Sequence, residues 1–178
     1  LQFRRYARSQ IFAFDFGGSI RAAALAMSGD WHDLGGSLAE DASEPVALQP
    51  LAGIDAEEER AWAAEWVAAI LAREKIDITP DVKEHVWSAL NNLAGLSVLL
   101  QSQALKQALK PYCVGGPWGR LLDAETERVG SADVLAFETE GLIGTGAAAA
   151  VLAYLFHRIE HRLDGRPTLL IVDEGWLA

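Results

Sequence analysis

The sequence of 178 residues has little cysteine: Cys113 stands alone and cannot form a disulfide within the chain. This content is typical of a protein kept in a reducing compartment. Long apolar runs are also missing. The longest uncharged apolar stretch, residues 141–156, is shorter than the roughly 20 residues that a membrane-spanning helix requires. Near the start, Asp15 interrupts the apolar run that follows three arginines, so the sequence predicts no signal peptide.

Basic residues are scarce relative to acidic ones, with 15 Lys and Arg against 25 Asp and Glu, and the formal net charge is −10. A surface with this average charge repels nucleic acid, and no direct nucleic-acid contact is predicted for this chain. The hydrophobic content of 51% favours a packed fold over disorder. The first residue, Leu1, and an end two residues after Trp176 indicate a fragment of a longer protein.

The sequence contains no phosphate-binding P-loop, which requires a glycine followed by lysine and a hydroxyl residue. None of the four lysines, at positions 75, 83, 106 and 110, follows a glycine. The glycine-rich segment 115–120 lacks the lysine and the hydroxyl, and we interpret it as a structural turn. Gly141, Gly144 and Gly146 reverse the spacing of a dinucleotide-binding fingerprint and predict a flexible loop.

Three apolar runs are present, at residues 11–14, 134–137 and 169–172, and an acid follows each of them. Continuous apolar runs separated by helices are typical of a parallel sheet whose faces are both covered. The sequence therefore predicts an α/β fold. We expect residues 1–178 to form one domain, with a helical insertion at about residues 51–112.

Helices are predicted from apolar spacing and from capping residues. Ser19 is expected to cap a helix over residues 20–27, and Asp55 with Glu58 resembles a capping box that opens a helix ending near Lys75. Thr79 with Pro80 predicts the next helix start. Two further helices are expected at about residues 96–109 and 147–163. We expect the tryptophans of the insertion to line the seam between its first two helices, namely Trp62, Trp66 and Trp87.

The strongest chemical pattern is the acid pair Asp173–Glu174 at the end of the third apolar run. Ligands of open α/β sheets bind at the carboxyl ends of the strands. In a nucleotide hydrolase, Asp173 would hold Mg²⁺ through water and Glu174 would polarise the attacking water. Because Asp15 and Glu138 also follow apolar runs, we expect the acids to gather along one sheet edge. The alternative is a strand that ends in solvated acids.

Two rival functions remain open from the residues alone. His157 and His161 match the H-x-x-E-H pattern of a zinc peptidase, although basic residues and histidines also suit the last turns of a helix. The helices of residues 55–109 could instead form a non-catalytic assembly or docking module.

As a whole, the sequence resembles the TrbE-type ATPases of conjugal transfer, within the CagE/TrbE/VirB family of type IV secretion ATPases. The resemblance is carried in order by residues 10–15, 31–36, 60–66, 96–102, 115–123, 152–160 and 169–176.

The resemblance implies a RecA-like P-loop NTPase core that binds ATP and Mg²⁺, with the Walker B acids at Asp173 and Glu174. It places the P-loop upstream of Leu1, so we expect this chain alone to be inactive. It also implies a hexamer that works with other secretion components in the cytoplasm, at the inner face of the bacterial inner membrane.

Overall fold

The computed structural model describes residues 2–35, 46–91 and 102–173. The chain divides into two compact units, Leu1–Val46 with Arg128–Ala178 and Ala47–Glu127. The insertion expected at about residues 51–112 lies within the second unit. No helix in the described ranges is both long and apolar enough to cross a membrane.

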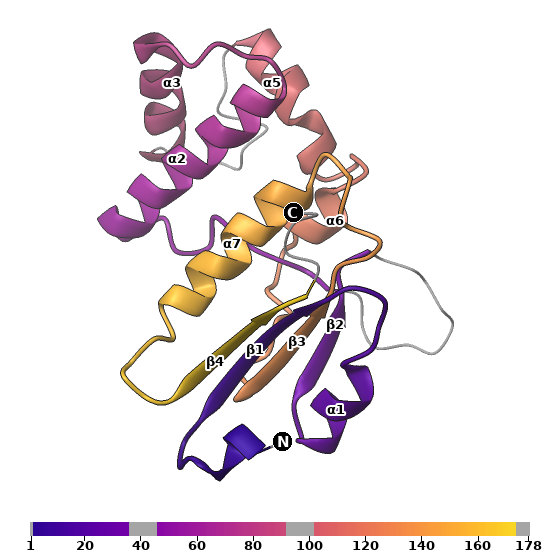
Figure 1. Ribbon diagram of the computed structural model, residues 1–178. Coiled ribbons are helices and arrows are strands. Elements are labelled where there is room, and N and C mark those ends of the chain that lie inside the picture. Colours follow the sequence, from indigo (N-terminus) through magenta and orange to yellow (C-terminus); the bar gives the residue numbers. More distant parts are fainter. Residues whose placement is uncertain (1, 36–45, 92–101, 174–178) are drawn as a thin grey trace. The chain divides into compact units, whose positions relative to one another are not determined.

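The first unit is built on a four-stranded sheet in the order β2-β3-β1-β4, and every pair of neighbours is parallel (Figure 1). The strands are β1 (Gln10–Asp15), β2 (Asp30–Asp33), β3 (Val134–Glu138) and β4 (Thr168–Val172). A short 3-10 helix, η1 (Gln2–Arg5), precedes β1. The α/β fold with a parallel sheet is confirmed.

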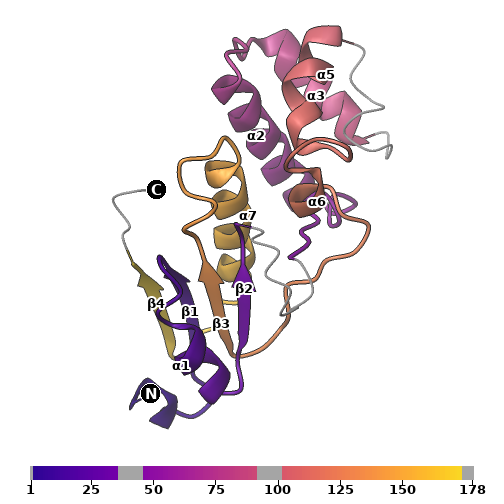
Figure 2. The ribbon, with the colours of Figure 1, turned by 90° about the vertical axis from the view of Figure 1, so that its right-hand side faces the viewer.

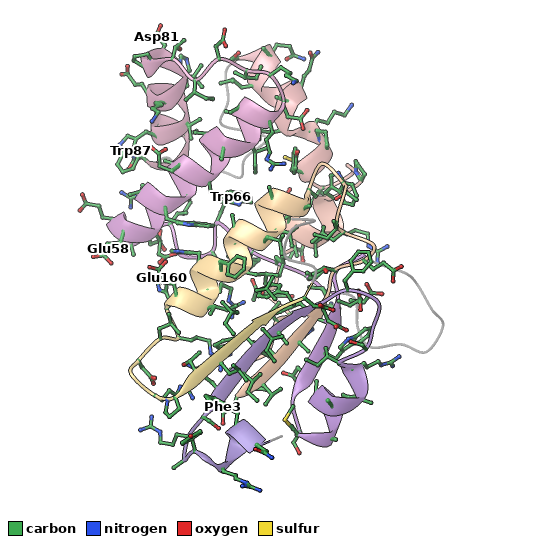
Figure 3. All side chains as sticks on the ribbon, viewed as in Figure 1. Phe3, Glu58, Trp66, Asp81, Trp87 and Glu160 are labelled. Carbon is green, nitrogen blue, oxygen red and sulfur yellow. The ribbon has the colours of Figure 1, made fainter. Side chains whose placement is uncertain are left out.

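Helices cover the two faces of this sheet. On one face, Ile11 and Ala13 of β1 pack with Ala24 of α1 (Arg21–Ala26), and Phe3 packs against the same cluster (Figure 3). On the other face lies α7 (Ala148–Glu160), whose Phe156 ring is 4.8 Å from the ring of Phe14 (Figure 2). Because successive side chains of a strand point to opposite faces, β1 is apolar throughout its middle.

Strand β4 differs from its prediction. The sequence predicts a buried strand at the centre of the sheet, but among the described strands β4 lies at the edge, next to β1 only. Leu170 is 46% exposed, Ile171 36% and Val172 46%. The prediction of a buried strand was wrong for the described structure because an apolar run specifies an environment and does not supply the neighbouring strand.

The start of α1 also corrects a prediction, because Ser19 does not cap it. The N-cap of this helix is Ile20, and its N–H donates to the Asp15 carboxylate at 2.9 Å. The Ser19 hydroxyl donates to the same carboxylate at 2.7 Å. Asp15 attracts both donors because it is negatively charged and buried, so it acts as the capping group from the end of the strand.

The second unit is helical, with α2 (Glu57–Arg73), α3 (Pro80–Asn91) and α5 (Gln103–Leu109), then η2 (Lys110–Tyr112) and α6 (Gly119–Leu122). Of the helix expected at about residues 96–109, residues 96–101 lie outside the described part. Trp66 of α2 is 5% exposed and stacks on Trp62 at 5.8 Å. Trp87 of α3 is 39% exposed, so the expectation that it lines the seam was wrong (Figure 3).

The capping box predicted at Asp55 and Glu58 is absent, because α2 begins at Glu57 with Ala56 as its N-cap and no side-chain cap. The Arg60 guanidinium instead turns back and donates to the carbonyls of Ile54 and Asp55, at 2.9 and 3.0 Å. The prediction for α3 is confirmed, since the Thr79 hydroxyl accepts the Val82 N–H at 3.3 Å.

The glycine-rich segment near η2 is a turn, as predicted. Gly115 has a φ of +87°, a backbone conformation that favours glycine. A side chain at Gly119 would collide with the Cys113 carbonyl group. Packing and turn geometry account for these glycines.

Candidate functional site

The carboxyl ends of all four strands lie at the same edge of the sheet. Asp15 and Glu138 are register partners, and Asp33 is paired with Glu138 from the other side. The Asp173 N–H follows β4 and donates to the Phe14 carbonyl at 2.8 Å, which extends the ladder by one residue. The expectation that Asp15, Glu138 and Asp173 gather at one edge is confirmed.

Asp15 closes the turn from β1 into α1. It is 4% exposed and accepts the two hydrogen bonds from Ser19 and Ile20. Its backbone carbonyl receives both the N–H of Thr139, at 2.9 Å, and the Thr139 hydroxyl, at 2.7 Å. These bonds fix the ends of β1 and β3 to each other.

Glu138 holds the turn that follows β1 from across the sheet. It is 7% exposed, and its carboxylate accepts N–H groups from Gly17 at 3.1 Å, from Gly18, and from Glu140 at 2.8 Å. Gly17 and Gly18 have φ values of +96° and +69°, which let their amides point at one acceptor. A buried carboxylate needs such donors, since its charge is costly without them.

Sequence reasoning did not find this contact between Glu138 and the Gly17–Gly18 turn. The two segments are about 120 residues apart along the chain, so no local spacing connects them. The signal in the sequence was the Gly-Gly pair close after an acid at a strand end, which requires an acceptor for its amides.

Asp173 has a different environment from the two buried acids. Its residue is exposed, and it emerges at the mouth of the sheet beyond the last residue of β4. An exposed carboxylate at this position can accept hydrogen bonds from water bound to a cation. Its predicted partner, Glu174, lies outside the described residues.

The residues of this chain fit one side of a Mg²⁺–nucleotide site. Asp173 supplies an exposed carboxylate at the strand end where ligands of such sheets bind. The 178 residues contain no Gly-Lys-Ser or Gly-Lys-Thr sequence that could hold the phosphates. A complete site would therefore require groups from outside this chain.

The rival zinc motif lies on α7, where His157 and His161 approach each other with ring centroids 4.4 Å apart. Their i, i+4 spacing puts both on one helix face, as predicted. A zinc site on this pair stays a prediction, which metal analysis of the purified chain would test.

The arginines at the opposite, amino end of the sheet serve the structure of that end. Arg166 pairs with Asp133 at 2.9 Å, and Arg162 donates to the Ala132 carbonyl at 2.8 Å. Burial, followed by the nearby positive charge of Arg166, lowers the pKa of Arg162. These bonds tie the loop before β3 to the segment between α7 and β4.

Comparisons with known proteins give the chain relatives over nearly its whole length. It is 40% identical over 186 residues to a probable conjugal transfer protein TrbE of Sinorhizobium fredii, covering 99% of this chain and 28% of that protein. It is also 40% identical to the conjugal transfer protein TrbE of Rhizobium radiobacter, covering 99% of this chain and 23% of that protein. The chain therefore spans about a quarter of the length of these curated relatives.

More distant similarity reaches the VirB4 proteins. The chain is 22% identical over 151 residues to the type IV secretion system protein virB4 of Bartonella quintana. Its fold matches that of VirB4 of Thermoanaerobacter pseudethanolicus, with a TM-score of 0.64 and 15% identity, over 99% of this chain and 78% of that one. No family model matches the sequence.

These findings agree with the fold, a parallel sheet with helices on both faces, and the RecA-like α/β class is confirmed. The resemblance predicted from the sequence is confirmed as well: nearly the whole chain corresponds to a portion of the longer TrbE-type conjugal transfer proteins.

Proposed function

We propose that this chain is part of an ATP-hydrolysing motor for conjugal DNA transfer or type IV secretion, and that it supplies the Walker B acids. The observation that carries the proposal is the position of Asp173, exposed at the carboxyl end of a strand in an all-parallel sheet. The names of its relatives, conjugal transfer protein TrbE and type IV secretion system protein virB4, support the setting.

In the proposed site, Asp173 orients Mg²⁺ through its water ligands, and Glu174 orients and polarises the water that attacks the γ-phosphate. When bound, the metal supplies positive charge that offsets the charge of the phosphates. Asp15 and Glu138 do not compete for this role, because donors from Ser19, Ile20 and the Gly17–Gly18 turn already occupy their carboxylates. They hold the edge of the sheet in place.

The groups that grip the phosphates come, in this proposal, from residues outside the chain. We therefore expect the 178-residue chain to show no Mg²⁺-dependent ATP hydrolysis. In the complete motor we propose a hexamer that acts with other secretion components in the cytoplasm, at the inner face of the inner membrane.

The test is a Glu174→Gln substitution in the full polypeptide that contains these 178 residues. Glutamine keeps the size of the side chain but cannot polarise water as a carboxylate does. We expect ATP binding to persist while hydrolysis falls by about a hundredfold or more.

Fluorescent ATP titration would measure binding, and phosphate release would measure hydrolysis. A Glu140→Gln variant is the matched control, because Glu140 is an exposed acid at the same sheet edge. Equal hydrolysis by Glu174→Gln and wild type would remove the proposed role of Glu174. Hydrolysis by the pure 178-residue chain would show that the phosphate-binding groups lie within it.

A further inference from the structure

The outer edge of β4 is open in this structure. Among the described strands its only neighbour is β1. Leu170 and Val172 align with Phe12 and Phe14 on the α7 face, and Ile171 aligns with Ala13 on the opposite face. All three β4 side chains are between 36% and 46% exposed. Apolar side chains on both faces of an edge strand are therefore in contact with solvent.

The backbone of β4 alternates between its two sides. The Asp173 N–H donates to the Phe14 carbonyl at 2.8 Å, and the Pro167 carbonyl accepts the Gln10 N–H at 2.9 Å. Odd-numbered residues of this segment therefore turn their polar groups toward β1. By alternation, Leu170 and Val172 turn their N–H and C=O groups toward the open edge.

This edge carries none of the usual features that prevent pairing. Natural edge strands are protected by lysine, proline, inward-pointing charges or bulges. The β4 sequence Thr-Leu-Leu-Ile-Val has no charged residue and no proline. Phe156, which contacts Phe14 from α7, is 39% exposed and extends the apolar surface on that face. Continuous apolar sequences of this kind are typical of strands that are covered on both faces within a parallel sheet.

We propose that another β-strand pairs with β4 along this open edge, and that it comes from the same polypeptide outside the present 178 residues. The curated relatives have the length to supply it, since this chain covers only 28% and 23% of them. We infer a parallel pairing, because all three described strand pairs are parallel. The added strand would hydrogen bond to Leu170 and Val172, and its carboxyl end would lie beside Asp173.

Proline substitutions in the full polypeptide test this pairing. Leu170→Pro removes an N–H that faces the open edge, whereas Leu170→Ala shortens the side chain and keeps that N–H. If a strand is paired there, Leu170→Pro lowers the melting temperature by several degrees more than Leu170→Ala does. If the edge is free, the two variants melt alike, and the proposal is wrong. Ile171→Pro is the reference, because its N–H faces β1 and its loss is costly in either case.

Hydrogen exchange in the unmutated protein covers the case in which Leu170→Pro does not fold. We expect the Leu170 and Val172 amides to exchange as slowly as Ile171 in the full polypeptide, and much faster in the 178-residue chain. Fast exchange of both amides in the full polypeptide would overturn the proposal. Protection that depends on protein concentration would also overturn it, since it would assign the edge to a second copy. Neither measurement depends on ATP hydrolysis, so both are independent of the proposed function.

Discussion

Glu138 accepts more hydrogen bonds at the sheet edge than a solvated acid needs. Three backbone N–H groups, from Gly17, Gly18 and Glu140, point at its carboxylate, and the residue is 7% exposed. Hydrogen bonds to a charged acceptor are stronger than neutral ones. Its role is to fix the β1–α1 turn, and that turn borders the edge where Asp173 emerges.

We predict that Glu138→Gln destabilises the protein by about 1–3 kcal/mol, because the amide loses the charge and one acceptor oxygen while the glycine amides stay in place. Urea denaturation followed by circular dichroism would measure the change. Glu140→Gln is the control, since the side chain of Glu140 is exposed. Equal stabilities of the two variants would contradict the role assigned to Glu138.

Tyr112 is the buried titratable group with the clearest pH consequence. Its hydroxyl donates to the Glu74 carboxylate at 2.8 Å, and the residue is 3% exposed. Burial, together with this hydrogen bond and the charge of Glu74, raises the pKa of Tyr112 to about 12 from 10.0. A raised pKa in the folded state means that the stabilisation is complete below pH 10 and is lost as the pH rises from 10 to about 12.

We therefore predict that the unfolding free energy falls by on the order of 2 kcal/mol between pH 9 and pH 12 through this residue. Tyr112→Phe should flatten that part of the stability profile while keeping the ring in place. Denaturant titrations at several pH values would measure it. A profile that is equally steep in Tyr112→Phe would assign the loss to other groups.

Among the elements, the end of α2 stores backbone strain at Lys75. The Ile76 N–H donates to the Leu71 carbonyl at 3.0 Å, and the Lys75 N–H donates to the Ala72 carbonyl at 3.1 Å. This pair of bonds forms a Schellman motif, which places Lys75 at a φ of +66°. Glycine adopts this conformation without the steric cost of a Cβ atom.

We predict that Lys75→Gly stabilises the protein by about 1 kcal/mol, because it relieves the left-handed conformation of a residue with a side chain. The melting temperature should rise accordingly. Lys75→Ala is the matched control, since it removes the same charge but keeps the Cβ atom. If both variants raised the melting temperature equally, the gain would come from the charge and not from the backbone.

The elements differ in how far the sequence predicts them. The runs that became β1 and β3 were found because central parallel strands are apolar on both faces. The same pattern predicted β4 but placed it at the sheet centre, since the pattern does not depend on whether the neighbouring strand is present. The capping box at Asp55 failed because the Arg60 side chain occupies the nearby carbonyls, a contact that spacing alone does not show.

At the scale of the whole molecule, the sequence predicted the gathering of acids at one sheet edge but not their division of labour. Parallel strands bring their carboxyl ends together by topology, so Asp15, Glu138 and Asp173 had to share an edge. Which of them is buried depends on donors far away in the chain, such as Gly17 and Gly18 for Glu138. The structure leaves Asp173 exposed and uses the other two as supports.

The most direct test of this account is an Asp173→Asn substitution in the full polypeptide, with Glu140→Gln as control. ATP hydrolysis is measured as a function of Mg²⁺ concentration, together with the melting temperature. The account predicts that Asp173→Asn folds normally but loses about a hundredfold or more of its Mg²⁺-dependent hydrolysis, because a neutral amide orients hydrated Mg²⁺ poorly. Wild-type hydrolysis with an unchanged Mg²⁺ dependence would contradict it.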